Sequence, residues 1–425
     1  ILYFTHRLLD KTQVDKGLRL MTLLISLPLL LTFVFHDLAA DVPICLLLLI
    51  YLDITTGKNF FGNTKKNLLC ALIGALSYFA KAYAMPSFVI HFIILQLVLY
   101  WQSKEAGKKL ILARNLMLFP LVFFALTVPW MYVLSEKYGY ATFGYSGRLN
   151  FFWTLIPRKQ PEYLLSGPPA HHTSHWVDPW YFFKDSQYQP YSFSFSLFVK
   201  EARVFLENVI TVLRSFHAIS FLSNVIILTL FLYVIKKREP LLTLFMLMIA
   251  ILPAGYMLVH IETRFLWALA MIVLITGVVF LERAMHHFNF KGNLRFLCEC
   301  IFFVSFLIYP INFLKDNAGK GKEVFQLAAE LKQKGITDKA IVSTDPSFEL
   351  GRISYLTNNR AFSLTRTTYT YEELGQALKE NNIDYFFFYY KSPHELEVFR
   401  LTNVYKQAVD TVKTGRANLL LLNMR

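Results

Sequence analysis

Nine long apolar runs divide most of this chain, and they constrain its fold more than any other feature. An α-helix needs about 20 apolar residues to cross the hydrocarbon core of a bilayer, and most of the runs approach that length. Hydrophobic residues make up 55% of the 425 residues. We therefore predict a polytopic α-helical membrane protein. The expected spans cover about residues 18–35, 38–53, 67–82, 85–101, 110–133, 218–235, 240–259, 264–282 and 295–314.

Lysine and arginine gather in alternate loops, which predicts the orientation of the chain. Cytoplasmic loops of membrane proteins carry an excess of these residues. The net charge of +14 then reflects cytoplasmic loops and anionic headgroups, with no nucleic-acid partner. The short loops on the opposite side carry only Lys81 and Arg264, at their edges. The long loop 134–217 and the C-terminus are therefore expected outside the cytoplasm. The basic residues of the cytoplasmic loops are Arg7, Lys11, Lys16, Lys58, Lys65, Lys66, Lys104, Lys108, Lys109, Arg114, Lys236, Lys237, Arg238, Arg283, Lys291 and Arg295.

The outer loop 134–217 is too long for a plain connection and contains a helical pattern near its end. Between residues 196 and 216, apolar side chains recur near helical spacing and charged side chains lie between them. We expect an amphipathic helix lying on the outer leaflet. The apolar members are Phe198, Phe205, Val209, Val212 and Leu213, and the charged ones are Lys200, Glu201, Arg203 and Glu207.

Residues 315–425 have the composition of a soluble domain. Helical patterns alternate there with short buried strands, which predicts a small α/β domain with a mainly parallel sheet. No glycine-rich phosphate loop follows any strand, so we assign no nucleotide site. The boundary to the membrane domain is placed at residue 314. Helices are expected at 323–334, 348–356 and 371–381, and strands at 340–343, 384–390 and 419–422.

A short acidic link joins the first two apolar runs. Asp37 and Asp41 lie four residues apart, next to His36, and no Lys or Arg accompanies them. On a helix this spacing places both carboxylates on one face. Paired carboxylates can bind a divalent metal or act as a general base. The alternative is that Asp37 caps the following helix and faces headgroup water.

Two further groups of charged residues are expected on the same side of the membrane. Lys81 ends an apolar run, where it either contacts a phosphate or extends to the lipid headgroups. His260, Glu262 and Arg264 share one short turn between two apolar runs. An arginine in such a turn can bind a lipid phosphate bidentately. The alternative is a local surface ion pair between Glu262 and Arg264.

A histidine-rich stretch in the outer loop is a fourth candidate. His171, His172 and His175 precede Asp178, and their spacing would suit a metal site on a helix. Prolines at 168, 169 and 179 favour a loop instead, which makes a metal site the weaker alternative. No Ser-His-Asp order and no C-x-x-C pair is visible.

These motifs together resemble the GT-C membrane glycosyltransferases of the dolichyl-phosphate-mannose protein mannosyltransferase and aminoarabinose-transferase type (family 39-like). The similar stretches are HDLAAD at 36–41, GALSYFAKAYAMPSF at 74–88 and HIETRFLW at 260–267. SGPPAHHTSHWVDPWYF at 166–182 also looks like a loop of bacterial members. The resemblance covers residues 1–314 and implies a GT-C-like bundle with a periplasmic C-terminal domain, in the bacterial cytoplasmic (inner) membrane.

The resemblance implies a hexosyl or pentosyl glycosyltransferase whose donor is a polyprenyl-phosphate sugar. The acceptor would be a lipid, a glycan or a protein, and membrane lipids would surround the donor. Lys81 and Arg264 would bind the donor phosphate, with Glu262 orienting Arg264 and His260 beside it. Asp37 or Asp41 would take an acidic catalytic role. No cofactor is certain, and a divalent metal is one alternative.

One departure from the family concerns its principal acidic motif, an Asp-Glu pair in the first outer loop. The chain begins at Ile1 inside an apolar stretch, so we expect an N-terminally incomplete chain. With two further helices the full protein would have eleven spans in the same orientation, and the fragment would lack the main catalytic base. The competing hypothesis is a polyprenyl-lipid or glycolipid transporter, or flippase, that binds the lipid without cleaving a bond. A third is a non-catalytic membrane scaffold for the C-terminal domain.

Overall fold

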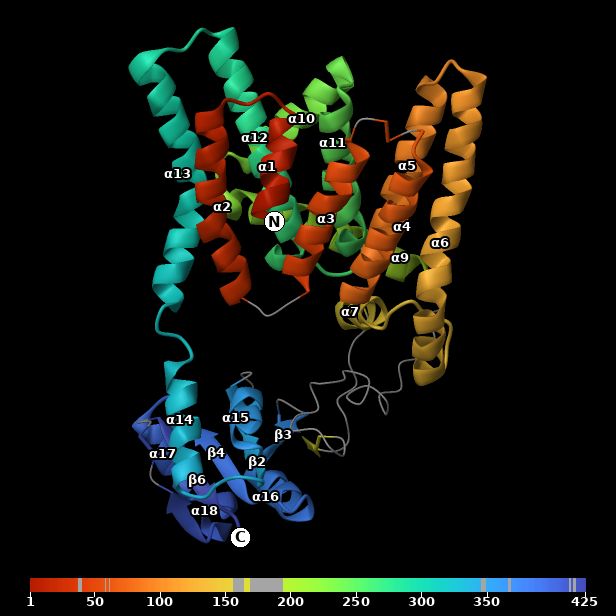
Figure 1. The fold of residues 1–425 in the computed structure, drawn as a ribbon. Helices are drawn as coiled ribbons and strands as arrows, with labels where there is room; N and C mark the ends of the chain where they lie inside the picture. Colours follow the sequence, from red (N-terminus) through yellow and green to blue (C-terminus); the bar gives the residue numbers. More distant parts are fainter. Residues whose placement is uncertain are drawn as a thin grey trace. The chain divides into compact units, whose positions relative to one another are not determined.

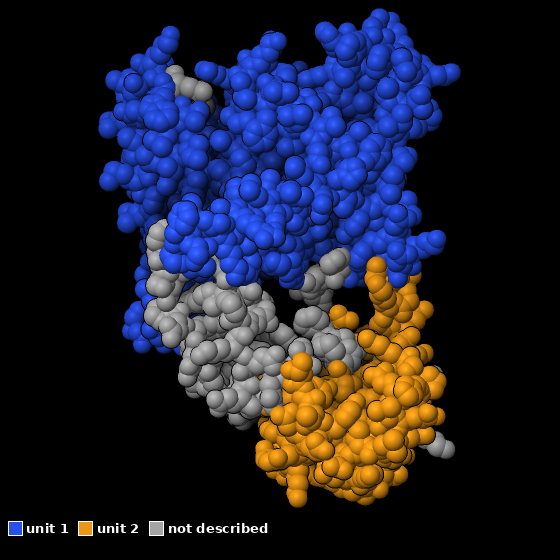
Figure 2. Space-filling view, turned by 180° about the vertical axis from the view of Figure 1, so that it is seen from behind, with its two compact units in different colours: residues 1–156, 192–316 blue, residues 157–191, 317–425 orange. Residues whose placement is uncertain are grey.

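The computed structural model of the chain contains two compact units, coloured separately in Figure 2. The first comprises Ile1–Ile156 and Ser192–Asp316, and the second comprises Pro157–Tyr191 and Asn317–Arg425. The structure describes residues 1–36, 40–57, 59–60, 62–155, 164–168, 194–344, 349–365, 368–412, 414–415 and 418–425.

The first unit is built from helices, and a helix occupies every position where a span is predicted (Figure 1). The apolar runs therefore form continuous helices, as expected where no water can satisfy an open backbone. Its helices are α1 (Leu2–Asp10), α2 (Lys16–His36), α3 (Asp41–Thr55), α4 (Thr64–Ala80), α5 (Ala84–Gln102), α6 (Ala106–Tyr138), α7 (Ser146–Leu155), α9 (Phe195–Ile219), α10 (Ser223–Lys237), α11 (Pro240–Met257), the 3-10 turn η2 (Thr263–Leu266), α12 (Trp267–His287) and α13 (Gly292–Asn317).

Six helical stretches of the described residues are long and apolar enough to cross a membrane, and α9 with α10 would make a seventh if counted as one bent span. The length and composition of these helices support the prediction of a membrane protein. The predicted count of nine is not confirmed, because α3, α4 and α10 have only 15, 17 and 15 residues. A 15-residue helix is about 22 Å long, against a hydrocarbon core of about 30 Å.

Helix α12 forms the centre of the first unit. Its residues from Trp267 to Val279 are buried on all sides, including an unbroken fully buried run from Leu269 to Ile275. A helix that is apolar all round belongs in the interior of a bundle. At its start, Trp267 stacks on Phe33 of α2 with ring centroids 4.7 Å apart. Helices α1, α2, α3, α10 and α11 pack against α12.

The second unit contains a six-stranded sheet with the order β1-β3-β2-β4-β6-β5. The predicted mainly parallel sheet is wrong in this respect. Strand β2 runs parallel to both of its neighbours, whereas β1, β6 and β5 pair antiparallel. The chain end returns directly from β5 into β6 without a crossover helix, and parallel pairing needs such a crossover. The strands are β1 (Leu165–Ser166), β2 (Ala340–Ser343), β3 (Arg360–Leu364), β4 (Tyr385–Tyr389), β5 (Asp410–Val412) and β6 (Leu419–Asn423).

Helices cover both faces of this sheet, which explains the continuous apolar sequence of β4. Phe386 and Phe388 point into one core and Phe387 into the other, and all three are buried. Alternate side chains of a strand face opposite sides of a sheet, so both faces of β4 lack water. Helices α14 (Lys322–Gln333) and α15 (Glu349–Thr357) supply the Phe387 core. Helices α16 (Tyr371–Glu380), α17 (Pro393–Arg400) and α18 (Asn403–Gln407) supply the other.

The edge strand β1 comes from the predicted outer loop. Leu165 pairs with Leu364 of β3, and Leu164 is buried in the same core as Phe386. Gly167 lies so close to the Phe362 ring that a Cβ atom there would come within 2.6 Å of it. Residues 164–168 of the outer loop therefore pack with the second unit, whereas α7 and α9 belong to the first.

We expect residues 315–425 to fold alone as a soluble α/β domain, because both cores lie almost wholly within this segment. Phe387→Ala should lower the free energy of unfolding of the isolated segment by about 3–5 kcal/mol, since the residue is fully buried. Phe325→Ala is the matched control, because this ring on α14 is exposed and its loss should change stability by less than about 0.5 kcal/mol. Urea unfolding followed by circular dichroism measures both. An unfolded spectrum for the isolated segment would contradict the prediction.

Candidate functional site

An ion pair joins the start of α3 to the end of α4. Asp41 is the first residue of α3, and Lys81 follows the last residue of α4 in an extended conformation. Lys81 Nζ donates a hydrogen bond to Asp41 Oδ1 at 2.5 Å. A carboxylate is favoured at a helix N-terminus and a cation at a helix C-terminus, so both helix dipoles support the pair. Asp41 is only 5% exposed, which makes a charged partner necessary.

The ammonium group of Lys81 also lies on an aromatic stack. Its Nζ is 4.1 Å from the ring centroid of Phe265 and 5.3 Å from that of Tyr256. Tyr256 stacks on Phe265 with centroids 4.4 Å apart, and Tyr83 lies 3.7 Å from Tyr256 on centroids. Such rings attract a cation through their negative faces. The aromatic stack of Tyr83, Tyr256 and Phe265 therefore helps to hold Lys81 in place.

The hydroxyl group of Tyr83 is inserted into the backbone of α11. It accepts a hydrogen bond from the Gly255 N–H and donates one to the Leu252 carbonyl, both at 2.8 Å. Pro253 lies between these residues and contributes no N–H to the helix. A Cβ atom at position 255 would lie 2.6 Å from the Tyr83 oxygen. Only glycine therefore leaves room for this hydroxyl, which fixes the stack to α11.

A second group of charges lies in the turn between α11 and α12. The Glu262 carboxylate lies between two basic side chains, with Arg264 Nε at 2.6 Å and His260 Nε2 at 3.3 Å. The hydrogen bond with His260, together with the charge of Arg264, lowers the pKa of Glu262 below its usual 4.5. Because this pKa is lowered, the stabilisation is present at neutral pH and is lost only as the pH falls through the lowered value.

The two groups of charges belong to one site. Lys81 Nζ and Arg264 Cζ lie over the same Phe265 ring, 4.1 Å and 5.5 Å from its centroid. The side chains remain reachable, with exposed fractions of 23% for Lys81, 29% for Arg264 and 40% for Glu262. Two carboxylates balance two cations, so the empty site keeps no unpaired charge out of water. An anionic ligand can bind here by taking over a cation from a carboxylate, which then becomes free to act as a base.

The resemblance gives a role to six residues. The structure brings together five of them: Asp41, Lys81, His260, Glu262 and Arg264. Asp37 lies outside the described residues, as do His171, His172, His175 and Asp178. Sequence reasoning missed the aromatic stack. The available signal was the position of its members, since Tyr83 follows Lys81 by two residues and Phe265 directly follows Arg264.

Metal binding finds no support in the described part of the chain. No group of three or more His, Cys, Asp or Glu residues that could hold an ion occurs among the residues whose positions are described. The site shown by the structure instead combines single carboxylates with cations. The cationic side chains of this site suit an anion that bears oxygen atoms, and above all a phosphate.

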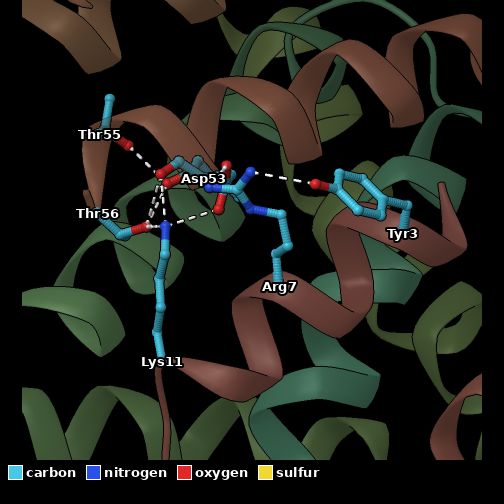
Figure 3. A network of polar contacts seen from close by, with 7 residues as sticks. Tyr3, Arg7, Lys11, Asp53, Thr55 and Thr56 are labelled. Carbon is cyan, nitrogen blue, oxygen red and sulfur yellow. Dashed lines mark hydrogen bonds and ion pairs between the residues drawn. The ribbon is translucent and has the colours of Figure 1, made fainter.

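A second buried aspartate lies at the other end of α3 and was not predicted as a special residue (Figure 3). Asp53 is 6% exposed and is paired with Lys11 Nζ at 2.6 Å and Arg7 Nη2 at 3.2 Å. Lys11 also donates to the Asp53 carbonyl at 2.6 Å and to Thr56 Oγ1 at 3.0 Å. A carboxylate is disfavoured at a helix C-terminus, which explains why two cations surround this one. We interpret the cluster as a structural link between α1 and α3.

Comparisons with known proteins add no assignment. The chain matches no protein-family model, no curated protein and no solved structure.

The ion pair between Asp41 and Lys81 gives a stability prediction. Asp41→Asn and Lys81→Met should each cost about 2–3 kcal/mol, below the value for a fully buried pair because Lys81 is partly exposed. The double variant should cost less than the sum of the two, since it leaves no buried charge without a partner. Unfolding by SDS titration in mixed micelles gives the three values. Strictly additive losses would show that the two side chains do not interact.

Proposed function

We propose that this protein is an integral membrane glycosyltransferase that moves a sugar from a polyprenyl-phosphate donor to a lipid, glycan or protein acceptor. The observation that carries the proposal is the site itself, in which Lys81 and Arg264 lie at the ends of apolar helices and both contact the Phe265 ring. The motifs around these residues resemble those of the GT-C enzymes. The resemblance concerns sequence motifs, and the structure adds the proximity of the residues that carry them.

The donor has the chemistry that this site can bind. Its phosphodiester carries a negative charge at the boundary of the bilayer, and its polyprenyl chain remains among the lipids. Lys81 and Arg264 would bind the phosphate oxygens. Transfer breaks the bond between the sugar carbon and the phosphate oxygen, so negative charge grows on the phosphate, and the two cations stabilise it.

The acceptor supplies the new bond to the sugar. Its hydroxyl group attacks the sugar carbon and gives its proton to a carboxylate, which acts as general base. Asp41 is the carboxylate of the described residues that fits this role, because binding of the phosphate to Lys81 would release it from its ion pair. Asp37 stays a second candidate from the sequence. Glu262 orients Arg264 through their ion pair.

The proposed function includes a membrane topology with nine spans. With nine spans, the short helices α3, α4 and α10 cross the membrane together with the six longer ones. The bundle would then be GT-C-like and lie in a bacterial cytoplasmic membrane, with the candidate site and the C-terminal domain outside the cytoplasm. The basic residues Arg7 and Lys11 at the other end of α3 agree with this orientation.

A flippase or transporter for the same lipid is the second candidate. The charge balance of the empty site supports a flippase or transporter as well as it supports a transferase, because binding and release of a phosphate need no bond cleavage. Transporters place their sites near the midplane of the bilayer, whereas these charges gather at helix ends. We therefore prefer the transferase.

Arg264→Ala should abolish sugar transfer by the full-length protein and leave membrane insertion intact, because the phosphate loses one of its two cations. Arg295→Ala is the matched control, since Arg295 pairs with Glu299 on α13 away from the site. The assay uses radiolabelled polyprenyl-phosphate sugars and membranes that contain the acceptor. Transfer by Arg264→Ala at the wild-type rate would contradict the role of Arg264. Saturable lipid binding without transfer from any donor would favour the flippase.

A further inference from the structure

Helix α9 carries a long exposed apolar stripe that no described part of the protein covers. The stripe members recur at intervals of three, four and seven residues, which places them within one face of the helix. Together they expose far more contiguous apolar surface than single surface residues do. The stripe consists of Phe195, Val199, Leu206, Ile210 and Leu213, all of them exposed.

The other two faces of α9 have different surroundings. A charged face carries Lys200, Arg203 and Glu207, all exposed, and Arg203 pairs with Glu207 at 2.8 Å. A third face packs on the bundle through the buried residues Val212 and Ser215. At 100° per residue, the centres of the three faces are spaced around the helix at intervals of roughly 120°. A helix at a membrane surface that packs on a protein has this arrangement of lipid, water and protein.

The direction of α9 indicates that a lipid bilayer covers the stripe. Helix α9 is bent by 113° from the apolar helix α10 that follows it, so the two cannot run through a membrane in the same direction. The charged face also prevents α9 from crossing the hydrocarbon core. The exposed stripe continues past Phe221 at the bend to the exposed residues Val225 and Leu228 of α10. The lipid that surrounds α10 would therefore also contact α9.

Two hydrogen bonds connect α9 to the turn that carries the candidate site. Asn208 Nδ2 donates to the Met257 carbonyl at 2.9 Å, just before the turn. Ser215 Oγ lies 3.1 Å from Thr263 Oγ1, just after Glu262. Helix α9 thus supports both ends of the turn that holds His260, Glu262 and Arg264. A displacement of α9 along the membrane normal would displace these residues with it.

We propose that the apolar stripe of α9 inserts into the lipid leaflet beside the turn and holds Arg264 at the depth of the headgroup phosphates. The docking surface itself is independent of sugar transfer. The further step, that the stripe sets the depth at which Arg264 meets the donor phosphate, rests on the proposed function. The occupant is a phospholipid leaflet, with acyl chains against the stripe and headgroups beside Lys200 and Arg203.

Spin labelling of the full chain in phosphatidylglycerol nanodiscs tests the docking. Nitroxide labels are placed singly at Val199 or Leu206 on the stripe, and at Arg203 or Glu207 on the charged face, with Cys298 and Cys300 replaced by Ser. We expect stripe labels to collide several-fold more often with oxygen than with a water-soluble nickel chelate, and charged-face labels to show the reverse. Equal nickel access on both faces would overturn the proposal. Shielding of the stripe from both reagents would do so as well, and would indicate a protein partner.

A second measurement tests whether α9 sets the depth of the turn. A label at Leu258, an exposed residue of the turn, reports that depth. The pair Val199→Glu with Leu206→Glu should move this label towards the nickel reagent, whereas the pair Arg203→Gln with Glu207→Gln should leave it unchanged. An unchanged label in the first pair would contradict the control of depth by α9. Neither result depends on sugar transfer, so a failure here is distinct from a failure of the transferase assay.

Discussion

The ion pair between Asp41 and Lys81 is the interaction on which the candidate site depends. A carboxylate that is almost fully buried must have a charged partner, because an unpaired charge in the interior costs several kcal/mol. This requirement fixes the start of α3 against the end of α4. Asp53 imposes the same requirement at the other end of α3, roughly 18 Å away along the helix axis. Helix α3 is therefore held at both ends by charges, although it is too short to cross a full bilayer without support.

The aromatic stack explains how the two halves of the site are held together. Lys81 rests on the rings of Tyr256 and Phe265 from a distant part of the chain, and the Tyr83 hydroxyl is fixed in α11 beside Gly255. Each cation of the site already has a carboxylate partner, so the empty protein keeps its charges without a ligand. A phosphate would then replace a carboxylate as the partner of a cation. Its binding would not require two unpaired cations to be taken out of water. Binding of the donor phosphate to Lys81 would therefore release Asp41 from its ion pair.

Local patterns predicted most of the fold, and tertiary contacts account for what they missed. Apolar periodicity located the helices of the bundle and most elements of the C-terminal domain, because burial acts on each segment separately. The distribution of Lys and Arg among the loops predicted that Asp41, Lys81 and Arg264 share one side of the membrane, and the structure brings these three residues together. The pairing of Tyr83 with Gly255 joins residues 172 positions apart, so no local pattern shows it. The two-residue strand β1 is likewise too short to produce a periodic signal and forms only through its partner β3.

The most direct test of the central claim is a solid-state NMR measurement of the distance between the site and the lipid phosphate. Protein labelled with ¹⁵N at lysine and arginine side chains is reconstituted with polyprenyl phosphate, and dipolar coupling between ¹⁵N and ³¹P is recorded. The account predicts coupling from one lysine and one arginine at hydrogen-bond distance, lost from the lysine signal in Lys81→Met and from the arginine signal in Arg264→Ala. Bound lipid whose phosphate couples to neither side chain would contradict it.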